Sequence, residues 1–94
     1  MRVPKLTESE VAERLSALSG WSIESDTLVK TFTFPDFVAA IKFVNALAVA
    51  AEAADHHPDL DIRYNKVKVA LTTHDSGGLT KNDFELAAKA EGLL

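Results

Sequence analysis

The sequence predicts an α+β fold with the element order α-β-β-α-β-β-α, in which three helices pack on one face of a four-stranded antiparallel sheet. Two pairs of segments alternate between apolar and polar residues, and each pair is joined by a short polar turn. Segments with helical periodicity precede, separate and follow these two predicted hairpins. Each hairpin has one apolar face, so helices gathered on that face are needed to cover it.

The first predicted helix begins at a capping box, because Thr7 is followed three residues later by Glu10. Apolar residues then recur at helical spacing until Gly20, a residue type that commonly ends helices. The chain next alternates, turns at Ser25-Asp26 and alternates again over residues 27–34. This pattern predicts the first β-hairpin.

The longest predicted helix covers residues 37–54 and follows the start signal Pro35-Asp36. Its length approaches that of a membrane span. We reject a span because the segment is rich in alanine, which contributes little transfer energy, and because Lys42 and Glu52 lie inside it, where a central lysine costs about 2.5–3.5 kcal/mol. The sheet covers only one side of such a helix, so the other apolar side predicts a homodimer or homotetramer.

A second hairpin is predicted from residue 60 to residue 71, with Asn65-Lys66 as its two-residue turn. This turn would pair Tyr64 with Val67 and set the register of the whole hairpin. A second capping box, Thr80 with Asp83, begins an amphipathic last helix. No linker or repeat marks a boundary, so residues 1–94 are expected to form a single domain.

Composition argues against several classes of protein. The net charge is −4 and the ten Lys and Arg residues are spread along the chain, which argues against direct nucleic-acid binding. The chain has no cysteine, so disulfides and thiolate metal sites are excluded. The first five residues lack the pattern of a signal peptide. These observations predict a cytoplasmic protein that does not associate with a membrane.

All three histidines lie in the segments Asp55-His56-His57-Pro58 and Thr73-His74-Asp75. Continued beyond the strands, the predicted register places His57 opposite His74 and so predicts that the three imidazoles lie close together. Pro58 disfavours helical geometry at His57, so the helix should end near His56 and the adjacent rings should point in different directions. Imidazole, with an ordinary pKa of about 6.5, can donate or accept a proton at neutral pH. The segments therefore predict a general acid/base site.

The motif around these histidines resembles that of the pterin-4a-carbinolamine dehydratases. It consists of Glu52-x-x-x-His56-His57-Pro58, followed at familial spacing by Tyr64, His74 and Asp83. The resemblance covers nearly the whole chain, including Gly20-Trp21, Phe34-x-Asp36-Phe37, Tyr64-Asn65-Lys66-Val67 and Leu79-Thr80. One departure is Leu60, where family members often carry tryptophan, and its loss is expected to weaken stacking on a flat pterin ring.

The resemblance implies a hydro-lyase that dehydrates 4a-hydroxytetrahydropterin, a by-product of aromatic amino-acid hydroxylases, to quinonoid dihydropterin. It implies a catalytic set of His56, His57 and His74, in which His56 and His74 transfer protons and His57 mainly binds the substrate. The remaining substrate-binding residues it implies are Glu52, Asp55, Pro58 and Asp83. Glu52 and Asp83 would orient histidines or accept pterin N–H groups. Proton transfer needs no redox cofactor and no metal, so neither is expected.

Two alternatives stay open. Three histidines are also the ligand set of some zinc enzymes, although adjacent side chains diverge and the predicted register supplies no further strong ligand. The other alternative is a non-catalytic module, because some family members are dimerisation partners of a transcription factor and related proteins are carboxylase assembly factors. The histidines retained together with Asp83 favour the enzyme. Asp83 is also expected as a capping residue, whereas Trp21 and Tyr64 are expected in the hairpin core.

Overall fold

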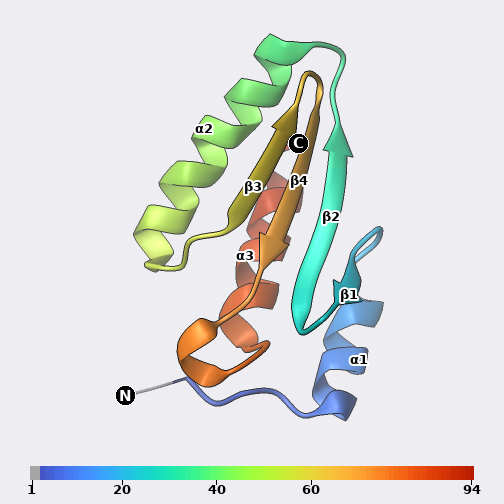
Figure 1. Cartoon of the computed structure of the whole chain (residues 1–94), viewed down its shortest axis with the longest axis vertical. Helices are drawn as coiled ribbons and strands as arrows, with labels where there is room; N and C mark the ends of the chain where they lie inside the picture. Colours follow the sequence, from blue (N-terminus) through green and yellow to red (C-terminus); the bar gives the residue numbers. More distant parts are fainter. Residues whose placement is uncertain (1–2) are drawn as a thin grey trace.

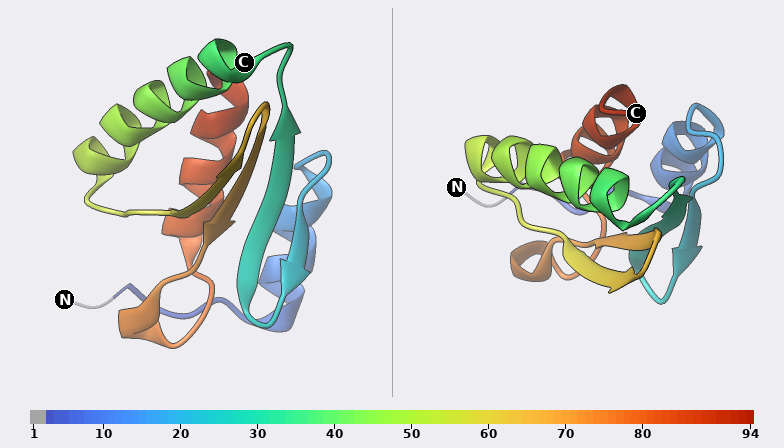
Figure 2. Two further views of the ribbon diagram at one scale, coloured as in Figure 1. Left: turned by 45° about the horizontal axis from the view of Figure 1, so that its top comes forward. Right: turned by 90° about the horizontal axis from the view of Figure 1, so that it is seen from above.

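The structure, a computed structural model, describes residues 3–94 and confirms the α+β class and the predicted order of elements (Figure 1). The elements are α1 (Glu8–Ser16), β1 (Ser22–Glu24), β2 (Thr27–Thr33), α2 (Phe37–Ala54), β3 (Asp59–Arg63), β4 (Lys66–Leu71), the 3₁₀ helix η1 (His74–Ser76) and α3 (Lys81–Gly92). The strands form one antiparallel sheet in the order β1-β2-β4-β3. Figure 2 shows α1, α2 and α3 on the same face of this sheet.

The core lies between the sheet and the three helices. Side chains at alternate positions of β2 and β4 meet one face each of α2 and α3. The largest buried apolar residues of this core are Trp21, Leu28, Phe32, Phe43, Leu47, Val67, Val69, Leu71, Leu79, Phe84 and Leu86. Each such aliphatic or aromatic side chain contributes about 1.5–3 kcal/mol when it is fully buried. Trp21 packs edge-on against Phe32, which confirms its expected place in the core.

Both predicted capping boxes are present. In the first, the Thr7 hydroxyl accepts a bond from the Glu10 N–H, and the Glu10 carboxylate accepts one from the Thr7 N–H. The pKa of Glu10 is lowered below its ordinary value. The main cause is the bond that its carboxylate accepts from the Thr7 N–H, and the Thr7 side chain is the second cause. This cap is therefore fully formed above the ordinary pKa of glutamate and weakens as the pH falls through the lowered pKa.

The first helix is shorter than the prediction, because α1 ends at Ser16 and not at Gly20. The N–H groups of Ala17 and Leu18 bond to carbonyls three residues back, which tightens the chain out of the α-helical path. Gly20 has a φ of +86° and lies in the connection to β1. The glycine therefore serves the turn and not the end of the helix.

The turn of the first hairpin was predicted correctly, whereas the register of the second was wrong. Ser25 and Asp26 both have positive φ, as in a type I′ turn. In the second hairpin the loop is Tyr64-Asn65, and Ile62 pairs with Val67. Because the register differs by two residues, the alternation of faces is preserved and β4 still presents its apolar residues to the core.

Contacts with β2 explain the unexpected turn. The Asn65 side-chain amide donates to the Phe34 carbonyl at 2.8 Å, and the Phe34 N–H donates to the Asn65 carbonyl at 2.8 Å. These two bonds hold Asn65 at the end of β2 and leave Tyr64 as the first loop residue, with a φ of +52°. Tyr64 is exposed, so its expected place in the hairpin core was also wrong.

The helix α2 buries one face, through Ala40, Phe43, Leu47 and Ala51. Asp36 caps its start, as predicted, by accepting a bond from the Ala39 N–H at 2.8 Å. Within residues 3–94 it is the one helix long and apolar enough to cross a membrane, with a mean hydropathy of 1.7. One face of the helix packs on β4 and on α3, and its outer face stays exposed.

Candidate active site

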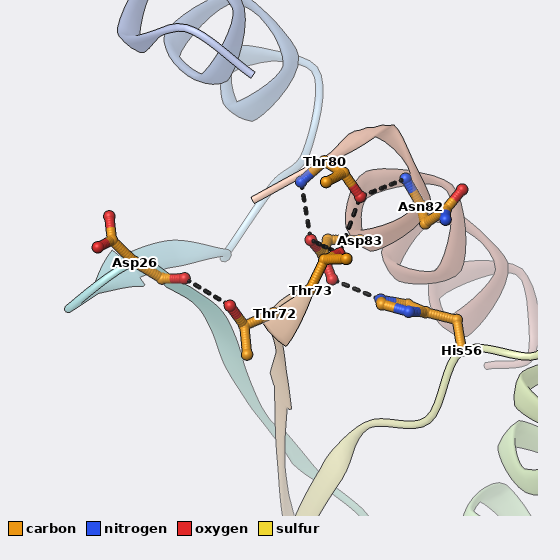
Figure 3. A network of polar contacts seen from close by, with 7 residues as sticks. All are labelled: Asp26, His56, Thr72, Thr73, Thr80, Asn82 and Asp83. Atoms are coloured by element: carbon orange, nitrogen blue, oxygen red, sulfur yellow. Dashed lines mark hydrogen bonds and ion pairs between the residues drawn. The ribbon is translucent and has the colours of Figure 1, made fainter. Parts of the chain in front are cut away.

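Three segments that are distant in the sequence meet beside the end of α2 (Figure 3). The helix stops at Ala54 because Asp55 adopts the left-handed conformation, with a φ of +51°. The next residue, His56, donates its N–H back to the Ala51 carbonyl, which closes the last turn. The turn directs the His56 side chain toward the residues between β4 and α3 and toward the first turn of α3.

The carboxylate of Asp83 is the centre of this meeting point and is fully buried. Its Oδ1 lies 2.5 Å from Nε2 of His56, whose side chain is 11% exposed. Its Oδ2 accepts two bonds of 2.9 Å, from the Thr80 N–H and from the Thr73 hydroxyl. One side chain therefore closes the cap of α3 and also contacts a candidate catalytic histidine.

The two threonines were not predicted as part of the site. Their hydroxyl oxygens lie 2.8 Å apart, and the Thr80 hydroxyl also accepts a bond from the Asn82 N–H. The sequence identifies Thr80 only as a helix cap and Thr73 only as the neighbour of His74. The signal that could have identified them is that Asp83 serves both the capping box of α3 and His56. Recognising it requires knowing where α2 ends, because the end of α2 determines where His56 lies.

The other motif carboxylate, Glu52, contacts His57. Glu52 Oε1 lies 2.5 Å from His57 Nε2, and both side chains are largely exposed. His56 therefore bonds to α3 whereas His57 bonds back to α2, which confirms the predicted divergence of the adjacent rings.

Two hollows flank the segment between α2 and β3. The first has a volume of about 680 Å³ and is lined by Val3, Asp55, His56, Thr73, Asp75, Ser76 and Asn82. The second has a volume of about 370 Å³ and is lined by Ala48, Ala51, Glu52, His57, Pro58 and Leu60. Of the predicted substrate-binding residues, Asp55 lines the polar hollow, Glu52, His57 and Pro58 line the more apolar one, and the buried Asp83 lines neither.

His74 begins η1 and is exposed. The pairing of His57 with His74 that predicted the cluster is wrong, because the ladder ends at Asp59 and Ala70 with a different register. Continued past its end, the observed register instead places His56 opposite Thr73, and both contact Asp83. Across residues 3–94, no three His, Asp or Glu side chains form a group that could hold a metal ion.

Known proteins are similar to this chain over almost its whole length. The sequence profile described as Pterin 4 alpha carbinolamine dehydratase matches residues 4–93. A protein of Chloroflexus aurantiacus, provisionally named pterin-4-alpha-carbinolamine dehydratase, is 53% identical over 92 residues, which cover 98% of this chain and 99% of the relative. A protein of Acidobacterium capsulatum with the same provisional name is 53% identical over 90 residues, covering 96% and 98%.

Two solved structures are similar to this fold. A transcriptional coactivator/pterin dehydratase from Brucella melitensis superposes with a TM-score of 0.92 at 40% identity, covering 95% of this chain and 97% of the other. A pterin dehydratase-like protein identified as a RuBisCO assembly factor in the alpha-carboxysome has a TM-score of 0.64 at 23% identity, covering 78% and 84%. The second likeness is one of fold alone.

Proposed function

The chain belongs to the pterin-4a-carbinolamine dehydratase family, and we propose that it dehydrates a 4a-hydroxytetrahydropterin to quinonoid dihydropterin by histidine acid/base catalysis in the cytoplasm. The observation that carries the proposal is the 2.5 Å contact between His56 and the buried Asp83 carboxylate beside a polar hollow. A histidine oriented by a buried acid is the arrangement expected of a general acid or base.

The reaction requires two proton transfers and no change of oxidation state. A general acid protonates the hydroxyl oxygen, the carbon–oxygen bond breaks, and water leaves. The lone pair of the adjacent ring nitrogen forms the new carbon–nitrogen double bond, and a base removes the proton of that nitrogen. The products are water and quinonoid dihydropterin, so the atoms balance without a redox cofactor.

We assign the proton transfers to His56 and His74 and mainly substrate binding to His57. His56 lines the polar hollow, and His74 lies between two other lining residues, Thr73 and Asp75. His57 lines the more apolar hollow together with Leu60, where a flat ring can pack. Glu52, Asp55 and Pro58, which line the two hollows, complete the proposed substrate-binding set. Asp83 is buried and lines neither hollow, so it belongs to this set by orienting His56.

The test is rapid-mixing kinetics on substrate generated by an aromatic amino-acid hydroxylase. His56→Ala and His74→Ala should each lower turnover by about 10²–10⁴-fold, or less where one histidine replaces the other. His57→Ala should raise KM more than it lowers turnover. Circular dichroism should show all three variants folded. A folded triple variant as fast as the wild type would rule out histidine catalysis.

Chelation separates this mechanism from a zinc enzyme. The two adjacent histidines bond to different carboxylates on different elements, which does not suit a shared metal ion. Dialysis against a chelator should leave turnover unchanged. Loss of activity on chelation, with recovery on adding zinc, would support the zinc mechanism instead.

A binding or assembly role is the second candidate function. The name of the Brucella relative combines coactivator and dehydratase, so one protein of this family carries both descriptions. A wild-type protein that folds but does not accelerate dehydration would favour the binding role. Genes for an aromatic amino-acid hydroxylase beside this gene would favour pterin recycling, whereas carboxylase genes there would favour assembly.

A further inference from the structure

We propose that Thr73 is a positioning residue, whose hydroxyl orients the Asp83 carboxylate and thereby determines which nitrogen of His56 carries the proton. The inference rests on the proposed function in assigning that proton to the dehydration. Thr73 itself contacts Asp83 and Thr80 through its hydroxyl and reaches the histidine only through the carboxylate. It therefore acts through another residue.

The bonds to Asp83 are divided between its two oxygens. Oδ2 accepts from the Thr80 N–H and from the Thr73 hydroxyl, both at 2.9 Å. Oδ1 is left to face Nε2 of His56 at 2.5 Å. Because the carboxylate is fully buried, these protein groups replace water as its partners. Rotation of the carboxylate would leave at least one buried donor without an acceptor.

The direction of each hydroxyl bond follows from the same arrangement. The single Thr73 hydroxyl proton is donated to Asp83 Oδ2, so Thr73 must accept from the Thr80 hydroxyl, 2.8 Å away. The Thr80 hydroxyl in turn accepts from the Asn82 N–H. A one-way series of bonds therefore runs from the first turn of α3, through the two threonines, to the carboxylate.

The carboxylate held by this series determines which nitrogen of His56 is protonated. An ionised carboxylate is only an acceptor, so Nε2 must carry a proton. In the neutral ring Nδ1 is then the unprotonated nitrogen, and it is the atom that gains or loses a proton. Without the Thr73 hydroxyl, the carboxylate is held on Oδ2 by one bond, and the preference for the Nε2–H tautomer should weaken.

The Thr73 backbone is held independently of its side chain. Its N–H donates to the Gly78 carbonyl at 3.1 Å, and its carbonyl accepts from the N–H groups of Ser76 and Gly78. Its backbone is extended, a conformation that suits β-branched residues. Thr73→Val therefore removes the hydroxyl at nearly constant shape, whereas Thr73→Ser keeps the hydroxyl.

The neighbouring Thr72 is a matched control. Its hydroxyl donates to the Asp26 carbonyl at 2.9 Å and points away from Asp83 (Figure 3). Thr72→Val thus removes the same group one residue away without touching the carboxylate.

The experiment records the tautomer of each histidine by two-bond ¹H–¹⁵N correlation spectra at alkaline pH, where the rings are neutral. The signals of His56 are assigned as those that disappear in His56→Gln. Wild type, Thr73→Ser and Thr72→Val should show the Nε2–H form of His56. Thr73→Val should show a mixture of tautomers and a turnover lowered about tenfold or more at nearly unchanged KM, as expected for losing a bond to a charged group.

Wild-type tautomer signals for His56 in Thr73→Val would overturn the proposal, whatever its turnover. If Thr73→Val does not fold, Thr73→Ala compared with Thr73→Ser makes the same test. If the wild-type protein does not accelerate dehydration, the proposed function fails, and the tautomer comparison alone still decides the role of Thr73.

Discussion

Two histidine–carboxylate pairs in this chain have the same separation and different surroundings. His56–Asp83 and His57–Glu52 each have an Nε2–oxygen distance of 2.5 Å. Asp83 is fully buried and also closes the cap of α3, whereas Glu52 is 79% exposed. An exposed pair exchanges its partners readily with water, so its net contribution to stability is small. Loss of a buried acceptor leaves donors without partners.

This difference predicts different responses to the same isosteric change. All three contacts of the Asp83 carboxylate are donors, so Asp83→Asn places an amide NH₂ either against the two donors to Oδ2 or against Nε2–H of His56. The free energy of unfolding should therefore fall by about 1–3 kcal/mol. Glu52→Gln should change it by less than about 0.5 kcal/mol. Urea denaturation of both variants at one protein concentration measures the difference. Equal changes would contradict the role given to burial.

The sequence identified most of the residues now seen at the site but not how they are grouped. The resemblance named His56, His57, Glu52 and Asp83, and the structure forms two pairs from these four. Thr73 was missed because a threonine beside a strand end has no distinctive pattern. Its contact with Asp83 depends on where β4 stops and α3 begins.

At the scale of elements, helix starts were predicted better than helix ends and strand registers. The start of α3 depends on Thr80 and Asp83, which lie three residues apart, so the sequence contains the whole cap. The register of β3 on β4 depends on Asn65, whose partner Phe34 lies 31 residues away. A turn preference read from neighbouring residues cannot include that distant contact.

The turn between β3 and β4 therefore offers two substitutions with opposite signs. Asn65→Ala removes the 2.8 Å bond to the Phe34 carbonyl and should lower the free energy of unfolding by about 1 kcal/mol. Tyr64→Gly relieves a φ of +52° in a tyrosine and should raise it by about 0.5–1 kcal/mol. Thermal and urea denaturation would measure both. Destabilisation by Tyr64→Gly would show that the tyrosine ring makes a contact that outweighs its strained backbone.

At the scale of the whole molecule, apolar residues remain exposed on one helix face and one strand. On α2, Val38 and Val49 are 62% and 72% exposed and lie about three helical turns apart on one stripe. The strand β3 is at an edge of the sheet and exposes Leu60 and Ile62. The small core covers one side of α2, and an exposed apolar face of this kind is typical of a protein–protein interface.

We therefore predict that the chain forms a homodimer or a homotetramer through the outer face of α2. Each exposed valine that becomes fully buried would contribute about 1.5–3 kcal/mol, so placing a charge there should weaken assembly strongly. Val49→Lys should raise the dissociation constant at least about tenfold, because a buried lysine without a partner is costly. Ala88→Lys, at an exposed position of α3, is the matched control and should assemble as the wild type does. Sedimentation equilibrium at micromolar concentration distinguishes these outcomes. A wild-type protein that sediments as a clean 10.2 kDa monomer would contradict the prediction and leave the apolar face of α2 exposed to solvent.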